Sequence, residues 1–91
     1  MKFKLIYTDS YIHRAKRFIK KHPEMLTQYE KTLKILENNP HHPSLRLHRL
    51  KGKFKDLHSV SINISYRITL AFYFNNNEIV PVNVGHHDDV Y

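Results

Sequence analysis

The residues best suited to chemistry lie in the stretch Gly85-His86-His87-Asp88-Asp89-Val90-Tyr91. It places two imidazoles, two carboxylates and a phenol directly after an apolar run, residues 79–84. Imidazole titrates near neutral pH, at about 6.5 when unperturbed, so it can either accept or donate a proton there. Glycine allows the backbone to turn sharply after a strand and to present the following residues at its end. We therefore take His86 and His87 as candidates for proton transfer.

The chain is strongly basic, and this composition indicates the kind of ligand. Its 91 residues include 15 Lys and Arg against 8 Asp and Glu, which gives a net charge of +7 with histidine neutral. Such a field attracts polyanions, nucleic acids among them. There is no cysteine, which excludes disulfides and thiolate metal sites. We expect a single domain over residues 1–91 and, because no signal or membrane-spanning pattern is present, a cytoplasmic protein.

The elements that must position these residues follow from hydrophobic periodicity. Alternation predicts a first strand, and helical spacing with Pro23 at a break predicts two consecutive helices. A long basic loop follows, and period-two alternation then predicts three strands separated by turns near Ser65 and at 75–77. The predicted ranges are strands at 2–8, 57–64, 66–74 and 78–84, helices at 11–21 and 23–38, and the loop at 40–55. The fold class is therefore α+β, in the order β-α-α-β-β-β, with a small, mainly antiparallel sheet and a helical hairpin packed on one face.

One face of the predicted sheet collects polar side chains. Val60, Ile62 and Ile64 alternate with serines and an asparagine, and the next strand places Arg67 and Thr69 on the polar side. The cations Lys51, Lys53 and Lys55 lead into the first strand of this sheet. We expect a polyanion to bind on this face.

If the ligand is RNA, these residue types are sufficient for strand cleavage. The 2′-hydroxyl is an internal nucleophile, so cleavage needs a base, a cation on the phosphate and a proton for the leaving 5′-oxygen. Either His86 or His87 could transfer protons, Arg67 offers a fork to phosphate oxygens, and Tyr91 could stack on a base. The loop lysines would contact the RNA backbone as point charges.

Plainer interpretations exist for the same residues. Arg67 could form a structural salt bridge with Asp88 or Asp89, and His86 and His87 could be ordinary exposed histidines. The loop lysines could form a solvated turn, and His58 could be a partly buried residue at the start of a strand. A metal site in the stretch 86–89 is disfavoured because adjacent residues of an extended chain point in opposite directions.

The element order and three motifs together resemble the RelE/ParE superfamily of toxins from toxin–antitoxin systems. The motifs are Leu47-His48-Arg49-Leu50-Lys51-Gly52, Tyr66-Arg67-Ile68-Thr69 and Val84-Gly85-His86-His87-Asp88-Asp89-Val90-Tyr91. The sequence is most similar to RelE and YafQ-like members. This resemblance implies a ribosome-dependent endonuclease that cuts mRNA in the A site, needs no metal or other cofactor, and is neutralised by a cognate antitoxin.

The resemblance also implies roles for individual residues. His87 lies where YafQ-like toxins carry a C-terminal catalytic histidine, His48 matches a second functional histidine, and Arg67 matches an arginine that contacts the scissile phosphate. His86 and Tyr91 complete the predicted catalytic set. The predicted RNA-binding residues are Arg46, Arg49, Lys51, Lys53, Lys55 and His58.

The sequence departs from the YafQ-like pattern at Ser61 and Ser65, where those toxins carry a histidine and an aspartate. Two other functions therefore stay open: a ParE-like inhibitor of DNA gyrase that acts by binding, and a degenerate member that binds only its antitoxin. For a nuclease, the basic helix at 11–21 and the loop lysines are predicted to bind ribosomal RNA. The antitoxin is expected to cover the basic face with an acidic or amphipathic segment.

Overall fold

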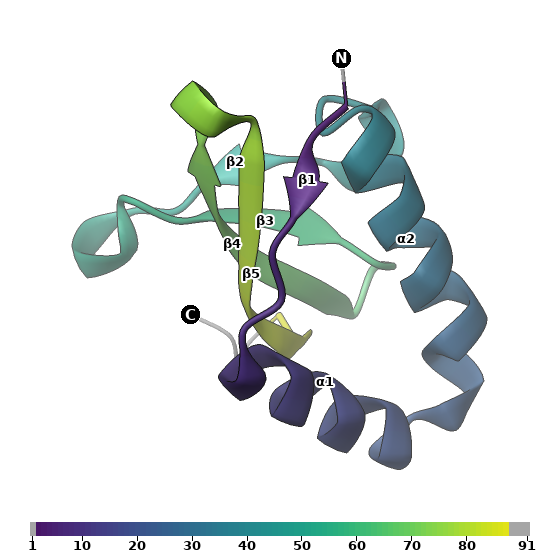
Figure 1. Ribbon diagram of the computed structural model, residues 1–91. Helices are drawn as coiled ribbons and strands as arrows, with labels where there is room; N and C mark the ends of the chain where they lie inside the picture. Colours follow the sequence, from purple (N-terminus) through teal and green to yellow (C-terminus); the bar gives the residue numbers. More distant parts are fainter. Residues whose placement is uncertain (1, 88–91) are drawn as a thin grey trace.

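The computed structural model describes residues 2–87, which form two helices and one five-stranded sheet (Figure 1). The strand order in the sheet is β1-β5-β4-β3-β2; β1 runs parallel to β5, and the other neighbours are antiparallel. The predicted α+β class is confirmed. The elements are β1 (Lys4–Leu5), α1 (Asp9–Lys21), α2 (Leu26–Asn38), β2 (His48–Arg49), β3 (His58–Ser61), β4 (Tyr66–Tyr73) and β5 (Glu78–His86).

The helices begin and end where local chemistry requires. Thr8 caps α1, since its hydroxyl accepts a hydrogen bond of 3.1 Å from the backbone N–H of Tyr11. Pro23 disfavours helical geometry at His22, where α1 ends, and starts a short 3-10 turn, Pro23–Met25, before α2. The helical pair is therefore the one that the sequence predicts, with the break at the expected proline.

The core lies between the helices and one face of the sheet. Phe18 of α1 and Leu36 of α2 pack with Val60, Ile68 and Ile79 from three strands. Within this core the hydroxyls of Tyr11 and Tyr29 lie 2.7 Å apart and hydrogen-bond each other. Two phenols thus satisfy their polar groups mutually, so both rings can be buried and can join α1 to α2.

Three details differ from the sequence-based prediction. The loop at 40–55 contains an extra strand, β2, which pairs with β3. The strand predicted to reach residue 64 ends at Ser61, and Ile64 is 84% exposed in the following turn. In α1 the buried aromatic is Tyr11, whereas Ile12 is 39% exposed. Each difference depends on where a tertiary partner lies, which local periodicity does not specify.

The pairing of β4 with β5 is the longest ladder of the sheet. It extends from Tyr66 opposite His86 to Tyr73 opposite Glu78, with an irregularity near Thr69 and Leu70. The predicted turn at 75–77 is present, and Asn77 adopts a left-handed φ of 53°, which asparagine tolerates better than most residues. No helix within residues 2–87 is long and apolar enough to cross a membrane.

The tyrosine pair provides a test of the core. Replacing Tyr11 by Phe leaves the buried Tyr29 hydroxyl without its partner, so we expect the free energy of unfolding to fall by about 1–2 kcal/mol. The double variant Tyr11→Phe/Tyr29→Phe leaves no buried hydroxyl without a partner. Its free energy of unfolding should therefore fall by less than the sum of the two single-variant losses. Urea denaturation of the four proteins measures this coupling. Strict additivity would contradict the mutual hydrogen bond.

Candidate active site

The register of the sheet determines which predicted residues share a face. Directly paired residues of antiparallel strands lie on the same face, and alternate residues of one strand do so too. Ser61 pairs with Arg67, and Ser59 pairs with both Thr69 and His48. These five residues define a surface that we call the arginine face. It lies opposite the face that packs on the helices, which carries Val60, Ile68 and Leu70.

The arginine face is less open than the sequence predicts. Ser59, Ser61 and Thr69 are 0%, 7% and 2% exposed. The 3-10 turn Pro43–Leu45 contacts β3 from the preceding segment. A polyanion therefore does not meet a row of exposed serines, and the accessible parts of this face include His48 at the edge and a pocket around Arg67.

That pocket is small, polar and basic. It encloses about 190 Å³. Its lining residues are Ser44, Arg46, Ser61, Asn63, Ile64 and Arg67. Arg46 enters from the end of the Pro43–Leu45 turn, where its backbone has a left-handed φ of 49°. Two arginines thus converge on a volume that no carboxylate of residues 2–87 lines.

The guanidinium of Arg67 is the most unusual group in this pocket. Its Nε and Nη1 atoms are buried, and neither has a hydrogen-bond partner among the residues that the structure describes. Buried donors are almost always satisfied, because an unpaired one loses the hydrogen bonds that water would provide. A planar guanidinium with two donors to spare matches the oxygen atoms of a phosphate or carboxylate. The pocket is therefore a candidate anion site.

His48 lies on the same face, and its imidazole is oriented by the backbone. Its Nδ1 lies 3.2 Å from the carbonyl oxygen of Arg46. A carbonyl can only accept, so the ring donates from Nδ1, and a neutral imidazole then carries its lone pair on Nε2. Standard strand spacing puts the Cα atoms of His48 and Arg67 about 12 Å apart. An exposed histidine and an arginine at this separation can act on one nucleotide from two sides.

His87 follows β5 and is tied to the turn between β3 and β4. Its backbone N–H donates to the carbonyl oxygen of Ser65 at 2.9 Å, and its ring lies 4.3 Å from that of His86, centroid to centroid. Because Arg67 pairs with Gly85, His87 follows the residue opposite Arg67 by two positions. The structure therefore brings His87 to the same end of the sheet as Arg67.

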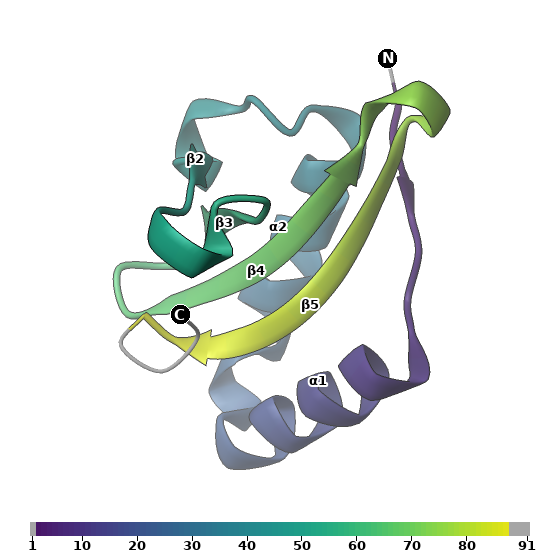
Figure 2. The same ribbon diagram turned by 90° about the vertical axis from the view of Figure 1, so that its left-hand side faces the viewer.

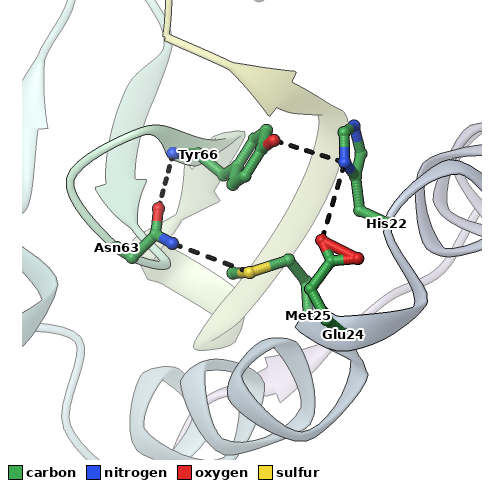
Figure 3. A network of polar contacts seen from close by, with 5 residues as sticks. All are labelled: His22, Glu24, Met25, Asn63 and Tyr66. Atoms are coloured by element: carbon green, nitrogen blue, oxygen red, sulfur yellow. Dashed lines mark hydrogen bonds and ion pairs between the residues drawn. The ribbon is translucent and has the colours of Figure 1, made fainter.

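A contact network that sequence reasoning missed extends from this end to the helices (Figure 3). The hydroxyl of Tyr66 lies 3.2 Å from Nδ1 of His22, which also lies 3.8 Å from a carboxylate oxygen of Glu24. The Tyr66 ring also makes an edge contact with His86, at 6.0 Å between centroids. The alternation of β4 predicts an inward Tyr66, but no local signal identifies His22 as its partner.

The remaining predicted RNA-binding residues separate into other surfaces. His58 and Arg49 lie on the face opposite His48 and line a different pocket of about 380 Å³ with Lys55. Lys51 and Lys53 belong to a turn that projects away from the helices (Figure 1), where Lys53 Nζ lies 5.2 Å from the centre of the Phe54 ring. These residues are therefore not all parts of one site.

Some predicted features lie outside the described residues. These are Tyr91 and the carboxylates of Asp88 and Asp89, including their suggested salt bridge with Arg67. Among residues 2–87, no group of three or more histidine or acidic side chains is arranged to hold a metal ion.

Arg67 gives a stability test that is independent of activity. Replacing Arg67 by Met removes two buried unpaired donors while keeping an unbranched side chain, so we expect the free energy of unfolding to rise by about 1 kcal/mol. Arg46→Met, at an exposed arginine of the same pocket, should change it little. Urea denaturation compares the two variants. A marked loss of stability in Arg67→Met would show that this guanidinium has a structural partner.

His58 should titrate abnormally. Burial, aided by Arg49, His48 and His41, lowers the pKa of His58 below its ordinary value. The unfolded chain then binds more protons as pH falls below about 6.5, so this histidine's contribution to stability is present above that pH and is lost below it. An NMR titration of the imidazole should show the lowered pKa, and Arg49→Gln should raise it only partly. An ordinary pKa in the native protein would contradict this environment.

Comparison with known proteins supports the architecture. No protein-family model matches the sequence, and a search of curated protein sequences finds no match. Solved structures do match. YafQ from E. coli shares 14% identity with a TM-score of 0.79, covering 99% of both chains. YafQ in the E. coli DinJ–YafQ toxin–antitoxin complex shares 16% with a TM-score of 0.77, covering 100% of this chain and 99% of that one.

A third match is the YoeB/ParE toxin from Agrobacterium tumefaciens, at 15% identity and a TM-score of 0.73, covering 93% of this chain and 99% of the other. At such identities the likeness concerns the fold rather than the chemistry. The chain therefore shares the fold of these solved toxins, which is the fold that its resemblance to the RelE/ParE superfamily implies.

Proposed function

We propose that this protein is the toxin of a toxin–antitoxin pair and acts as a ribosome-dependent mRNA endonuclease. The observation that carries the proposal is the Arg67 guanidinium, which has two buried donors without a partner among residues 2–87, in a pocket that no described carboxylate lines. A stable fold tolerates such a group when a ligand satisfies it. The scissile phosphate of RNA is an anion with the required pair of oxygens.

The reaction is a transfer at phosphorus. The 2′-oxygen of the nucleotide before the cut attacks the adjacent phosphate, an O2′–P bond forms, and the P–O5′ bond breaks. The proton of the 2′-hydroxyl goes to a base, and the departing 5′-oxygen receives a proton from an acid. The products are a 2′,3′-cyclic phosphate and a 5′-hydroxyl, and no metal is needed.

His48 is suited to the role of base. Its Nδ1 donates to the Arg46 carbonyl, so Nε2 of the neutral ring is the acceptor. Arg67 holds the phosphate and stabilises the negative charge that grows on its oxygens as the fifth bond forms. The two residues lie on one face of the sheet, which allows both to contact the same nucleotide.

His87 is the proposed acid, because it lies at the Arg67 end of the sheet and next to His86. His86 is directed toward Tyr66 instead, and we assign it to positioning His87 rather than to proton transfer. Tyr91 would stack on an unpaired base. Arg46, Lys51 and Lys53 would contact the backbone of the message or of ribosomal RNA, and Arg49, Lys55 and His58 would do so on the opposite face.

The two departures from the YafQ-like pattern, Ser61 and Ser65, leave this chain with fewer groups that can transfer protons. Ser61 lines the pocket beside Arg67, and Ser65 contributes its carbonyl to the backbone of His87. Neither can replace an imidazole or a carboxylate in proton transfer. The chemistry would therefore depend on His48 and His87 alone, and the loss of either should be severe.

An antitoxin is the proposed protein partner. The YafQ structure in complex with DinJ is one of the similar folds. The net charge of +7 favours a partner with an acidic or amphipathic segment.

Mapping the 5′ ends of a reporter mRNA in a cell-free translation reaction tests the nuclease. The native chain should produce cuts that end in a 2′,3′-cyclic phosphate and that require ribosomes on the message. His48→Ala and His87→Ala should each reduce the cutting rate by about 100-fold or more, as expected for loss of a general base or acid. His41→Ala, at an exposed histidine between α2 and β2 that has no proposed role, serves as the control and should cut normally.

Other outcomes would contradict the proposed nuclease function. A 3′-hydroxyl product would overturn the internal-nucleophile chemistry. Toxicity that survives His87→Ala and induces the DNA damage response would point to gyrase. If folded protein caused neither cutting nor toxicity, the chain would be a binding partner of its antitoxin only.

A further inference from the structure

A second basic pocket lies on the other side of the sheet, between α1 and the end of β5. It encloses about 590 Å³. Figure 2 shows α1 running beside the terminal part of β5, beyond the short stretch that pairs with β1. Its lining residues include Arg14, Arg17, Lys21, His22, Tyr66 and His86.

The helical wall of this pocket presents three cations in a row. Arg14, Arg17 and Lys21 are spaced by three and four residues, which places them on one face of α1. Within the described part of the chain, no carboxylate lines the pocket. Within residues 2–87 the ion pair between His22 and Glu24 is the only one, so none of the three cations is paired with a described acid. Like charges held side by side repel each other, and a bound anion would relieve this repulsion.

The opposite wall adds rings and polar groups at the end of the sheet. Tyr66 and His86 are paired across β4 and β5 and meet edge to face. His22 joins them from the end of α1 and packs on Tyr66, with ring centroids 4.8 Å apart (Figure 3). These contacts hold two imidazoles and a phenol in fixed positions, facing three long cationic side chains.

We propose that this pocket binds the phosphodiester backbone of single-stranded RNA next to the segment being cut. The inference rests on the proposed nuclease function and adds a substrate-binding site to it. Arg67 follows Tyr66, and Gly85 precedes His86, so the pocket and the arginine face occupy the same end of one strand pair. An RNA strand that leaves Arg67 passes around this end and meets the cations of α1.

The composition of the pocket favours RNA over an acidic peptide. Arginine forks match phosphate oxygens well, although they also match carboxylates. The neighbouring rings of Tyr66 and His86 provide edges and faces on which an unpaired base can pack, a feature typical of single-strand RNA sites. A site for acidic side chains alone would have no need of such rings.

The test measures binding without cleavage. In a His87→Ala background, fluorescence anisotropy gives the affinity for a fluorescein-labelled single-stranded RNA of about 12 nucleotides, within the usual site size of such proteins. The pocket variant is Arg17→Gln/Lys21→Gln. The matched control is Lys16→Gln/Lys20→Gln, which removes the same charge from exposed positions of α1 that do not line the pocket.

We expect the pocket variant to bind RNA about tenfold more weakly, whereas the affinity of the control variant should change less than threefold. The slope of log binding constant against log salt concentration should become shallower by about 0.7 for each cation removed from the pocket. The imidazole resonances of His22 and His86 should shift when RNA is added, and that of His13 should not. Equal losses of RNA affinity in the two variants, or no shift at His22 and His86, would mean that RNA is held by the general positive charge of α1 and not in the pocket. Either result would overturn the proposal.

Competitors separate the possible ligands. Inorganic phosphate at matched ionic strength should displace RNA only weakly. A glutamate-rich peptide that displaces RNA as well as unlabelled RNA does would instead assign the pocket to an acidic protein partner. The cleavage assay on ribosomes is independent of these measurements. Cutting without RNA binding in the pocket would reject this inference alone, and pocket binding without cutting would reject the nuclease alone.

Discussion

The hydrogen-bonded pairing of β4 with β5 is the constraint on which the other features of this molecule depend. It places Tyr66 opposite His86 and Arg67 opposite Gly85. Because successive residues of a strand point to opposite faces, this one register directs Arg67 toward the polar pocket and Tyr66 toward α1. A shift of a single residue would exchange the two side chains and would place a guanidinium in the core. The buried residues Ile68, Leu70 and Ile79 prevent such a shift, since it would turn their side chains toward solvent.

This arrangement has an energetic cost, because it gathers positive charges close together. Considering residues 2–87 alone, Arg67 has two buried donors without partners, and three cations line the pocket beside α1 with no carboxylate in its lining. Both features oppose folding, and the tyrosine pair and the apolar core must offset them. The proposed function accounts for these groups by a ligand that is itself an anion. Both pockets converge on the same end of the sheet, which is consistent with one extended anion rather than two unrelated ones.

The two proposed histidines differ in how the fold holds them. His48 lies on a two-residue edge strand, and its ring orientation comes from a hydrogen bond to a backbone carbonyl two residues away. His87 follows the longest strand and is held through its own backbone and through the ring of His86. Edge strands and strand ends are positions where the backbone can carry functional groups without disturbing the core. The fold thus separates the residues that stabilise it from those that would act on a substrate.

The sequence by itself determined both helices, four of the five strands and their order, because hydrophobic period, Pro23, the Thr8 cap and the asparagine turn are local properties of the chain. It also singled out Arg67, His48 and His87 as candidate site residues, since their motifs are local, and these assignments stay predictions. It did not reveal that Ser59 and Thr69 are buried, that His58 faces away from His48, or that His22 meets Tyr66. Those facts depend on strand register and on contacts between residues far apart in the chain. Only the tertiary structure decides them, because many distant contacts must be satisfied together before any one is defined.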